Sequence, residues 1–250
     1  MHYFKCGLLG EKLKHSFSPS LHQQLGFYEY KLYEKNKIEA IDFLKYGDYD
    51  VLNVTVPYKE LAFNLCNFHS HLCQTLGNAN IVVKNRNTGK LYGYNSDFEG
   101  FKCLVDDIDI CGKTCVIFGT GGASKTVKHV LSRLGVASII NVSRNSSLDN
   151  NTITYSNLPK IISSVDLIVN TTPVGMFPNV NHSPIDLELL NICSKKKLLA
   201  VVDLIYNPQP TKFLSYAANL GFKTIDGMKM LIKQAELSSI FMNGSISSAC

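Results

Sequence analysis

The chain has 250 residues, of which 45% are hydrophobic and 18% charged, and its formal net charge is +5. This length and apolar content suit one large or two modest domains with packed cores. The basic residues are scattered and form no run of like charge, which argues against a nucleic-acid partner and weakly favours small anionic ligands. No apolar stretch reaches the roughly 18–20 residues of a membrane span, and the first residues lack a signal-peptide pattern. We therefore expect no membrane association and a cytoplasmic location.

The eight cysteines and seven histidines show no metal-ligand spacing. No CxxC, HxxxH or HExxH pattern occurs, so we expect no catalytic metal. Most cysteines lie inside apolar runs, which is typical of free thiols that pack as small hydrophobes in a reducing compartment.

The first part of the chain predicts strands and helices in alternation. Short alternating or apolar runs indicate strands, and capping residues mark where helices begin. We expect strands over 3–9, 28–34 and 50–56, a hairpin whose turn is 87–89, and helices that begin near Ser18, Ile38, Tyr58 and Asp97.

The residues before the first helix contain two serines. Ser18 precedes Pro19, a pair typical of a helix start in which Ser18 is the cap and Leu21 and Leu25 form the apolar face. Capping does not explain Ser16 equally well, because it lies two residues upstream. The two hydroxyls could instead bind an anion together.

Lys59 and Asp97 each lie where a strand end meets a helix start. A lysine in the first turn of a helix opposes the helix dipole, so Lys59 is unusual there. Asp97 alone could be an ordinary N-terminal helix acid. Because α/β folds place active sites at such strand ends, we expect the two side chains to share a site.

The second part is organised around residues 115–135, which predict a strand, a tight turn with Gly119, Gly121 and Gly122, and a helix. Glycines let the backbone approach a ligand closely, and free N–H groups at a helix start attract a pyrophosphate. This pattern favours a dinucleotide site. Ser124 replaces the third glycine of the strict pattern and is small enough to keep close packing. A glycine-rich turn that binds nothing is the alternative.

The end of the next strand, 137–142, suggests which dinucleotide binds. An NAD site usually has Asp or Glu there for the ribose diol, whereas this chain continues with Ser143, Arg144 and Asn145. A guanidinium pairs well with a ribose 2′-phosphate, so we expect NADP rather than NAD. Arg144 could alternatively be a solvated loop cation. Further strands are expected over 166–170 and 198–204, and an amphipathic helix that carries Gln234 closes the chain.

These motifs together resemble the shikimate dehydrogenase family, in the family's order and over nearly the whole chain. The matching segments are HSFSPSLH (15–22), LNVTVPYK (52–59), LGNAN (76–80), GYNSDFEG (93–100), VIFGTGGAS (116–124), VNTTPVGM (169–176), VVDLIYNPQPT (201–211) and DGMKMLIKQA (226–235).

The resemblance implies an α/β fold of two domains. One is an α/β substrate domain, 1–97, completed by the C-terminal helix within 226–250, and the other is a Rossmann-type doubly wound NADP-binding domain, 98–225. On this basis Lys59 and Asp97 are catalytic. The implied substrate-binding residues are Ser16, Ser18, Thr55, Asn80, Asp97, Tyr206 and Gln234. The implied cofactor-binding residues are Gly119, Thr120, Gly121, Gly122, Ala123, Ser143, Arg144, Asn145, Thr171, Leu204 and Gly227.

The implied reaction is the reversible, NADPH-dependent reduction of 3-dehydroshikimate to shikimate, by a monomer or homodimer. Two alternatives stay open. The loop after Arg144 reaches Leu148 without the second basic residue that many NADP-dependent members carry, so a quinate/shikimate dehydrogenase with mixed NAD and NADP use is the first. A non-catalytic nucleotide-binding relative is the second, although such a protein would be expected to lack the Lys59 and Asp97 pair.

Overall fold

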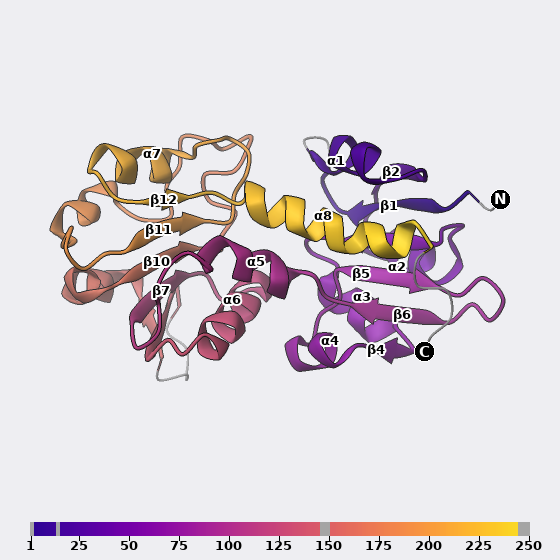
Figure 1. Cartoon of the computed structure of the whole chain (residues 1–250), viewed down its shortest axis with the longest axis horizontal. Helices are drawn as coiled ribbons and strands as arrows, with labels where there is room; N and C mark the ends of the chain where they lie inside the picture. Colours follow the sequence, from indigo (N-terminus) through magenta and orange to yellow (C-terminus); the bar gives the residue numbers. More distant parts are fainter. Residues whose placement is uncertain (1–2, 14–15, 146–150, 245–250) are drawn as a thin grey trace. The chain divides into compact units, whose positions relative to one another are not determined.

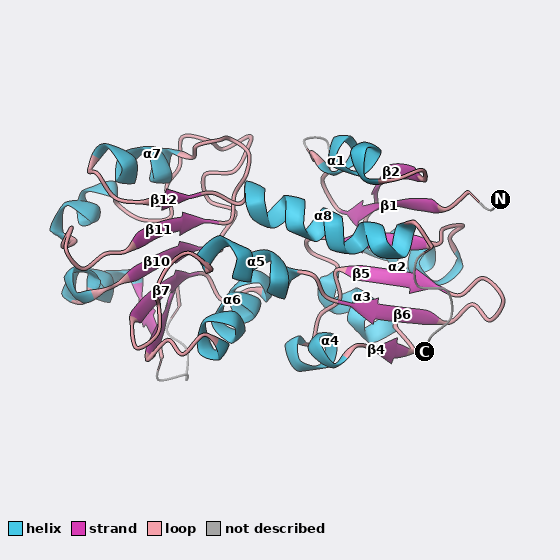
Figure 2. Cartoon of the chain, viewed as in Figure 1, coloured by secondary structure: helices cyan, strands magenta, loops and turns pink. Residues whose placement is uncertain are grey.

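The computed structural model describes residues 3–13, 16–145 and 151–244. The chain forms two compact units, one of residues 1–99 with 232–250 and one of residues 100–231. The chain passes from one unit to the other within helices α5 (Asp97–Val105) and α8 (Met228–Met242) (Figure 1). Each unit contains one six-stranded sheet with helices packed against it (Figure 2). The α/β fold class expected from the sequence is confirmed.

Unit 1 has a mixed sheet with the strand order β2-β1-β3-β5-β6-β4. Strand β1 is parallel to β2 and β3, whereas β5 is antiparallel to β3 and β6. Its elements are β1 (Lys5–Gly10), α1 (Ser18–Leu25), β2 (Glu29–Glu34), α2 (Lys37–Tyr46), β3 (Val51–Val54), α3 (Lys59–Leu65), β4 (Phe68–His69), α4 (His71–Leu76), β5 (Ile81–Lys84) and β6 (Leu91–Tyr94).

The register of unit 1 brings several loops to one edge of its sheet. Leu9 near the end of β1 pairs with Val54 at the end of β3. Because β5 runs the opposite way, its first residue, Ile81, lies at this same edge, where it pairs with Tyr94 at the end of β6. The segments after β1, β3 and β6 and the segment before β5 therefore meet there.

The start of α1 differs from the sequence-based expectation. The helix begins at Ser18, its N-cap is Phe17, and no side chain caps it. Ser18 is therefore inside the first turn, and the Ser16 hydroxyl oxygen accepts the Ser18 N–H at 3.2 Å. Ser18 and His22 are the buried residues of α1, and the expected apolar residues Leu21 and Leu25 are half-buried.

Unit 2 has an entirely parallel sheet with the strand order β12-β11-β10-β7-β8-β9. This is the order of the doubly wound dinucleotide-binding fold, in which successive strands are added in one direction across the sheet from the first strand, here β7, and in the opposite direction from the fourth, here β10. Its elements are β7 (Thr114–Phe118), α6 (Gly122–Arg133), β8 (Ser138–Ser143), β9 (Thr152–Thr154), η1 (Tyr155–Lys160), η2 (Ile162–Ser164), β10 (Leu167–Asn170), η3 (Leu187–Ile192), β11 (Ala200–Asp203), α7 (Lys212–Asn219) and β12 (Thr224–Ile225).

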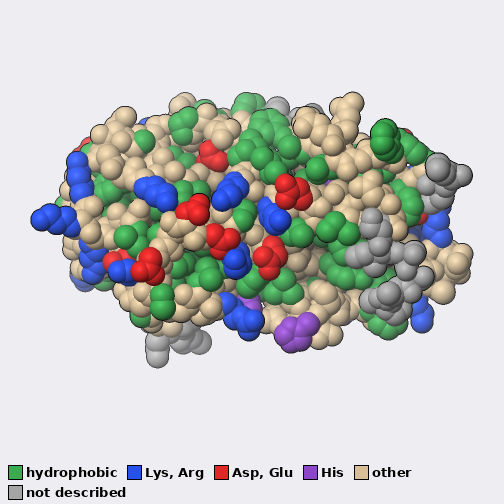
Figure 3. All heavy atoms as spheres, in the orientation of Figure 1, with side chains coloured by type: hydrophobic (Ala, Val, Ile, Leu, Met, Phe, Trp, Pro, Cys, Tyr) green, Lys and Arg blue, Asp and Glu red, His purple; other side chains and the backbone are tan. Residues whose placement is uncertain are grey.

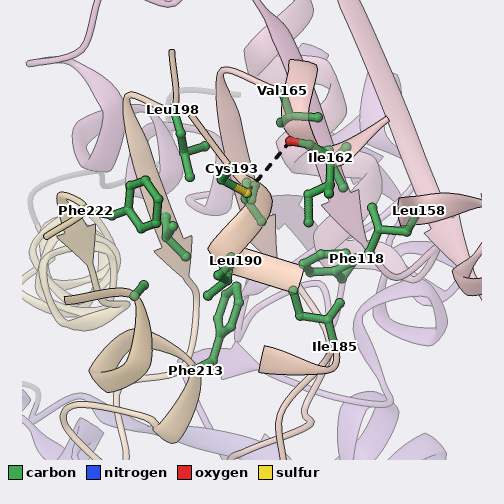
Figure 4. Packing of buried hydrophobic residues seen from close by; sticks show 14 of the residues in the cluster. Phe118, Leu158, Ile162, Val165, Ile185, Leu190, Cys193, Leu198, Phe213 and Phe222 are labelled. Carbon is green, nitrogen blue, oxygen red and sulfur yellow. Dashed lines mark hydrogen bonds between the residues drawn. The ribbon is translucent and has the colours of Figure 1, made fainter. Parts of the chain in front are cut away.

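A large apolar cluster covers one face of the unit 2 sheet (Figure 4). Phe118 of β7, Phe213 of α7 and Leu190 of η3 all belong to this cluster. Burying each such side chain contributes about 1.5–3 kcal/mol. Cys193 belongs to this cluster, and its thiol donates to the Ile162 carbonyl at 3.8 Å. The described cysteines are free, and most are buried, as expected for thiols packed as hydrophobes.

A second buried group, in unit 1, holds α1 against the sheet. The His22 ring is only 2% exposed and stacks on Tyr30 with ring centroids 3.9 Å apart. His22 Nδ1 lies 2.7 Å from the Tyr28 hydroxyl, and the Tyr30 hydroxyl donates to Asn53 Oδ1 of β3 at 2.9 Å. Burial lowers the pKa of His22 from 6.5 to about 4, although a hydrogen bond with Asn53 partly opposes this effect.

This burial predicts an acid-sensitive contribution to stability. Between pH 6.5 and about 4 the unfolded chain binds a proton at His22 that the folded chain does not, so the free energy of unfolding falls as the pH falls through this window. The shift corresponds to about 3 kcal/mol. We expect His22→Gln to lose less stability than the wild type between pH 7 and pH 4, measured by urea unfolding with circular dichroism. An equal loss in both proteins would contradict this assignment.

Candidate active site

An ion pair between Lys59 and Asp97 lies at the edge of the unit 1 sheet where the segments after β3 and β6 meet. β3 ends at Val54, earlier than the predicted end at residue 56 before Pro57, and Lys59 is the first residue of α3, with Tyr58 as its N-cap. Lys59 Nζ donates to Asp97 Oδ2 at 2.7 Å and to Oδ1 at 3.0 Å. The Asp97 side chain is 4% exposed and that of Lys59 21%. The ammonium thus keeps access to solvent while the carboxylate is buried.

Two further predicted residues complete the surroundings of Asp97. Its Oδ1 atom accepts hydrogen bonds from Asn80 Nδ2 at 2.9 Å and from Gln234 Nε2 of α8 at 2.7 Å. A buried carboxylate is costly unless it is paired and hydrogen-bonded, and these contacts supply both conditions. The structure therefore brings together Lys59, Asn80, Asp97 and Gln234, four residues that the resemblance assigns to one site.

Backbone contacts explain why these side chains converge. The Ala79 N–H donates to the Lys59 carbonyl at 3.0 Å, which joins the start of α3 to the loop before β5. Asn80 Oδ1 accepts the Ser96 N–H at 2.8 Å, and Asn95 Oδ1 accepts the Asp97 N–H at 2.9 Å. The loop after β6 is therefore held by side-chain amides, so that Asp97 begins α5 in a fixed position.

The other predicted substrate residues of unit 1 lie around the same edge. Thr55 follows β3, and its N–H donates to the Leu9 carbonyl at 2.9 Å. Ser16 lies in the segment after β1, and Ser18 is buried in the first turn of α1. Among the described residues, no hydrogen bond joins these three side chains to the Asp97 cluster. Tyr206 belongs to unit 2, so its grouping with the two serines stays a prediction.

In unit 2 the glycine turn follows β7, next to β10, where the direction in which strands are added to the sheet reverses. Gly119 has φ +102°, a conformation that favours glycine, and an added Cβ would lie 3.0 Å from Thr171 Oγ1. Thr171 follows the adjacent strand β10, and its hydroxyl donates to the Phe118 carbonyl at 2.6 Å. An added Cβ at Gly121 or Gly122 would meet nothing within 4 Å. The turn is therefore packed tightly on one side and open where a pyrophosphate would bind.

Asn141 is a buried residue of this turn that sequence reasoning missed. It is 5% exposed on β8, and its Nδ2 donates to the Gly119 carbonyl at 2.9 Å and to Ser124 Oγ at 2.7 Å. The amide thereby fixes the glycine turn to the start of α6, and Ser124 has a role that a third glycine could not fill. The sequence signal that could have identified Asn141 is its position as an amide inside the apolar run 137–142.

The predicted 2′-phosphate residues lie at the end of β8. Ser143 is the last residue of the strand, and Arg144 and Asn145 follow it as exposed residues. In the sheet register Ser143 pairs with Thr154, so β9 brings a second hydroxyl residue beside this segment. Leu148, where a second basic residue is absent from the sequence, lies outside the described residues.

Among the remaining predicted cofactor residues, Thr171 follows β10, Leu204 follows β11 and Gly227 follows β12. The Leu204 N–H donates to the Asn170 carbonyl at 3.1 Å, so the loops that carry Thr171 and Leu204 begin side by side. Gly227 packs closely on the second loop, because an added Cβ would come within 2.0 Å of the Leu204 carbonyl oxygen. The structure thus groups Thr171, Leu204 and Gly227, and it places Tyr206 on the same loop as Leu204.

The described residues of both units contain no group of three or more His, Cys, Asp or Glu side chains that could hold a metal ion. None of the described helices is both long and apolar enough to cross a membrane. On the face shown in Figure 3, basic and acidic side chains are interspersed rather than gathered by sign. Lys102 of α5 forms an ion pair with Asp106, which follows the helix, with Nζ and Oδ1 2.8 Å apart.

The sheet order, the glycine turn at the reversal point and the polar strand ends define a dinucleotide-binding α/β protein. The family model for the shikimate dehydrogenase substrate binding domain matches residues 8–82. A relative from Clostridium perfringens, named shikimate dehydrogenase (NADP(+)), is 34% identical over 95% of this chain and 92% of its own length. The chain therefore belongs to the shikimate dehydrogenase family.

Solved structures agree with this membership. A shikimate dehydrogenase from Peptoclostridium difficile matches 100% of this chain and 94% of its own with a TM-score of 0.86 and 33% identity. A quinate dehydrogenase from Corynebacterium glutamicum in complex with NAD matches 97% of this chain and 94% of its own with a TM-score of 0.81 and 25% identity. The fold is thus similar to structures of enzymes named for two different substrates.

Two glycine substitutions should have opposite effects. We expect Gly227→Ala to lower the melting temperature by several degrees, because its Cβ would collide with Leu204 and overpacking costs about 1–3 kcal/mol.

Gly121→Ala should leave the melting temperature within about 2 °C of the wild-type value, since its Cβ meets no protein atom, yet weaken NADP binding by at least about tenfold. Calorimetry and cofactor titration of both variants test this pair. An unchanged NADP affinity in Gly121→Ala would contradict a pyrophosphate site at the turn.

Proposed function

We propose that this chain catalyses the reversible reduction of 3-dehydroshikimate to shikimate with NADPH. The observation that carries the proposal is the Lys59 and Asp97 pair, with Asn80 and Gln234 bonded to the same carboxylate. It stands in a chain whose relative at 34% identity is named for this substrate and cofactor. The direct test is the initial rate of NADP reduction by shikimate, run in parallel with NAD.

Lys59 supplies the proton that the reaction requires. When bound, NADPH provides the hydride for the ring ketone. An alkoxide develops on the substrate oxygen, and an ammonium beside it both stabilises this charge and donates a proton. The two contacts from Asp97 hold Nζ in place, and the solvent access of Lys59 allows it to recover a proton from water.

The hydrogen bonds at Asp97 also suggest how the substrate is oriented. Oδ1 already accepts from Lys59, Asn80 and Gln234, whereas Oδ2 accepts from Lys59 alone. A substrate hydroxyl would therefore donate to Oδ2. A site built to pair substrate hydroxyls rejects analogues that lack them, because its own polar groups are then left unpaired.

The proposal assigns the substrate domain to unit 1 and the NADP domain to unit 2, with residue roles as the resemblance implies. Ser16, Ser18 and Tyr206 would bind the substrate carboxylate, and Thr55 a ring hydroxyl. Residues 119–123 would bind the pyrophosphate, 143–145 the 2′-phosphate, and Thr171, Leu204 and Gly227 the nicotinamide half. A cytoplasmic monomer or homodimer completes the proposal.

Replacing the proposed acid should separate chemistry from cofactor binding. We expect Lys59→Ala to bind NADPH within about twofold of the wild type and to lose at least ~100-fold in turnover, the scale of one general acid. Lys37→Ala is the matched control, because Lys37 is also the first residue of a helix but is exposed. Steady-state kinetics and NADPH fluorescence measure both quantities. A comparable loss of NADPH affinity would show that Lys59 has another role.

Arg144 is expected to determine cofactor preference. Loss of one charge-assisted contact costs about 1.5–3 kcal/mol, so Arg144→Gln should reduce the ratio of kcat/KM for NADP to that for NAD by about ten- to a hundredfold. Arg133→Gln, an exposed arginine in the last turn of α6, serves as the control. If the ratio is unchanged in Arg144→Gln, another group binds the 2′-phosphate.

The second candidate is a quinate/shikimate dehydrogenase of mixed cofactor use, favoured by the likeness to the quinate dehydrogenase structure. Rates with quinate and NAD discriminate between the two. Comparable efficiency on quinate would replace the narrower proposal, and no activity with either substrate would favour a non-catalytic nucleotide-binding protein.

A further inference from the structure

A hydrogen-bond network around Asp203 joins the two loops that carry Thr171 and Leu204. Asp203 is the last residue of β11 and is fully buried. Its Oδ1 accepts from Asn170 Nδ2 at 3.0 Å and from the Ile205 N–H at 3.1 Å. Its Oδ2 accepts from the Thr211 hydroxyl at 2.8 Å. One carboxylate therefore contacts the end of β10 and both ends of the loop after β11.

The contacts continue beyond Asp203 on each side. Asn170 Oδ1 accepts from the Thr172 N–H at 3.0 Å and from the Thr172 hydroxyl at 2.7 Å, which shapes the loop after β10. Thr211 Oγ1 accepts the Leu214 N–H at 3.3 Å and so caps α7. The network thus fixes the first residues of one loop and the last residue of the other.

A carboxylate suits this position because it offers acceptors only. The three groups that face it are all donors, and no ion pair between described residues involves Asp203. Burial raises the pKa of Asp203 to about 6, and the nearby charge of Asp226 adds to this effect, whereas the three hydrogen bonds oppose it. Retaining a buried acid here disfavours the fold, so packing alone does not explain its presence.

We propose that Asp203 is a positioning residue that aligns the loops after β10 and β11 for hydride transfer. The proposal rests on the function proposed above, in which Thr171, Leu204 and Gly227 hold the nicotinamide half. Leu204 is bonded through its N–H to Asn170 and packs on Gly227, so a shift of the Asp203 network moves all three positions. Misplacement by about 1 Å can slow a reaction by about a hundredfold.

The test compares two buried aspartates at opposite ends of the same sheet. Asp203 lies at the carboxyl ends of the strands, whereas Asp166 precedes β10 and accepts the Thr114 N–H at 2.8 Å. Asp203→Asn turns an NH2 group toward the Thr211 hydroxyl or toward the two N–H donors. It should lower kcat about tenfold and raise the primary isotope effect with shikimate deuterated at the carbon that loses hydride. NADPH affinity by fluorescence should change less than about threefold, because the adenosine half still binds.

Asp166→Asn should leave kcat and the isotope effect within about twofold of the wild-type values, even if the substitution lowers the melting temperature. If Asp203→Asn also leaves both unchanged, Asp203 is merely structural and the proposal is overturned. Wild-type protein that does not oxidise shikimate would instead overturn the proposed function, which keeps the two failures distinct.

A second pair of variants covers the case in which Asp203→Asn fails to fold. Thr211→Val removes the donor to Oδ2 and should reproduce the rise in the isotope effect, whereas Thr211→Ser keeps the hydroxyl and should restore the wild-type value. Equal isotope effects in the two Thr211 variants would contradict the proposal.

Discussion

The buried carboxylate of Asp97 is the constraint on which unit 1 depends. It accepts hydrogen bonds from Lys59 of α3, from Asn80 before β5 and from Gln234 of α8, three segments distant in sequence. Removing a partner from a buried charge costs about 3–5 kcal/mol, so these segments are held to a common point. The mixed sheet makes this possible, because β3 and β6 end, and β5 begins, at the same edge.

In unit 2, side-chain amides and one buried carboxylate hold the loops in place. Asn141 holds the glycine turn through hydrogen bonds to the Gly119 carbonyl and to Ser124. Neighbouring strand ends are joined in the same way by Asn170 and Asp203. Among the described residues, no buried side-chain nitrogen or oxygen lacks a hydrogen-bond partner. Buried polar groups thus determine the loop shapes at the carboxyl ends of this parallel sheet.

Sequence patterns predicted the parts of the molecule that have local signals. Apolar runs predicted the main strands, and strand-end reasoning placed Lys59 beside Asp97. Pro57 predicted the end of β3 too late, because the strand ends at Val54. The two-residue strand β4 and the three-residue strand β9 are too short to show periodicity. Helices α4 and α7 were not predicted either.

The residues that sequence reasoning missed act through distant partners. Asn141 bonds to a residue 22 positions away, and Asn170 to one 33 positions away. Ser18 was predicted to cap α1, yet it lies in the first turn of the helix, and Ser16 Oγ accepts the Ser18 N–H. The separate roles of the substrate and cofactor residues stay predictions that the geometry supports.

Each unit also contains a buried titratable group, and the two groups change the stability of their units in opposite directions as the pH falls. Acidification from pH 6 toward pH 4 charges an unfolded His22 and so weakens unit 1, whereas protonation of Asp203 removes a buried charge from unit 2. With respect to these two groups, mild acid lowers the free energy of unfolding of unit 1 and raises that of unit 2.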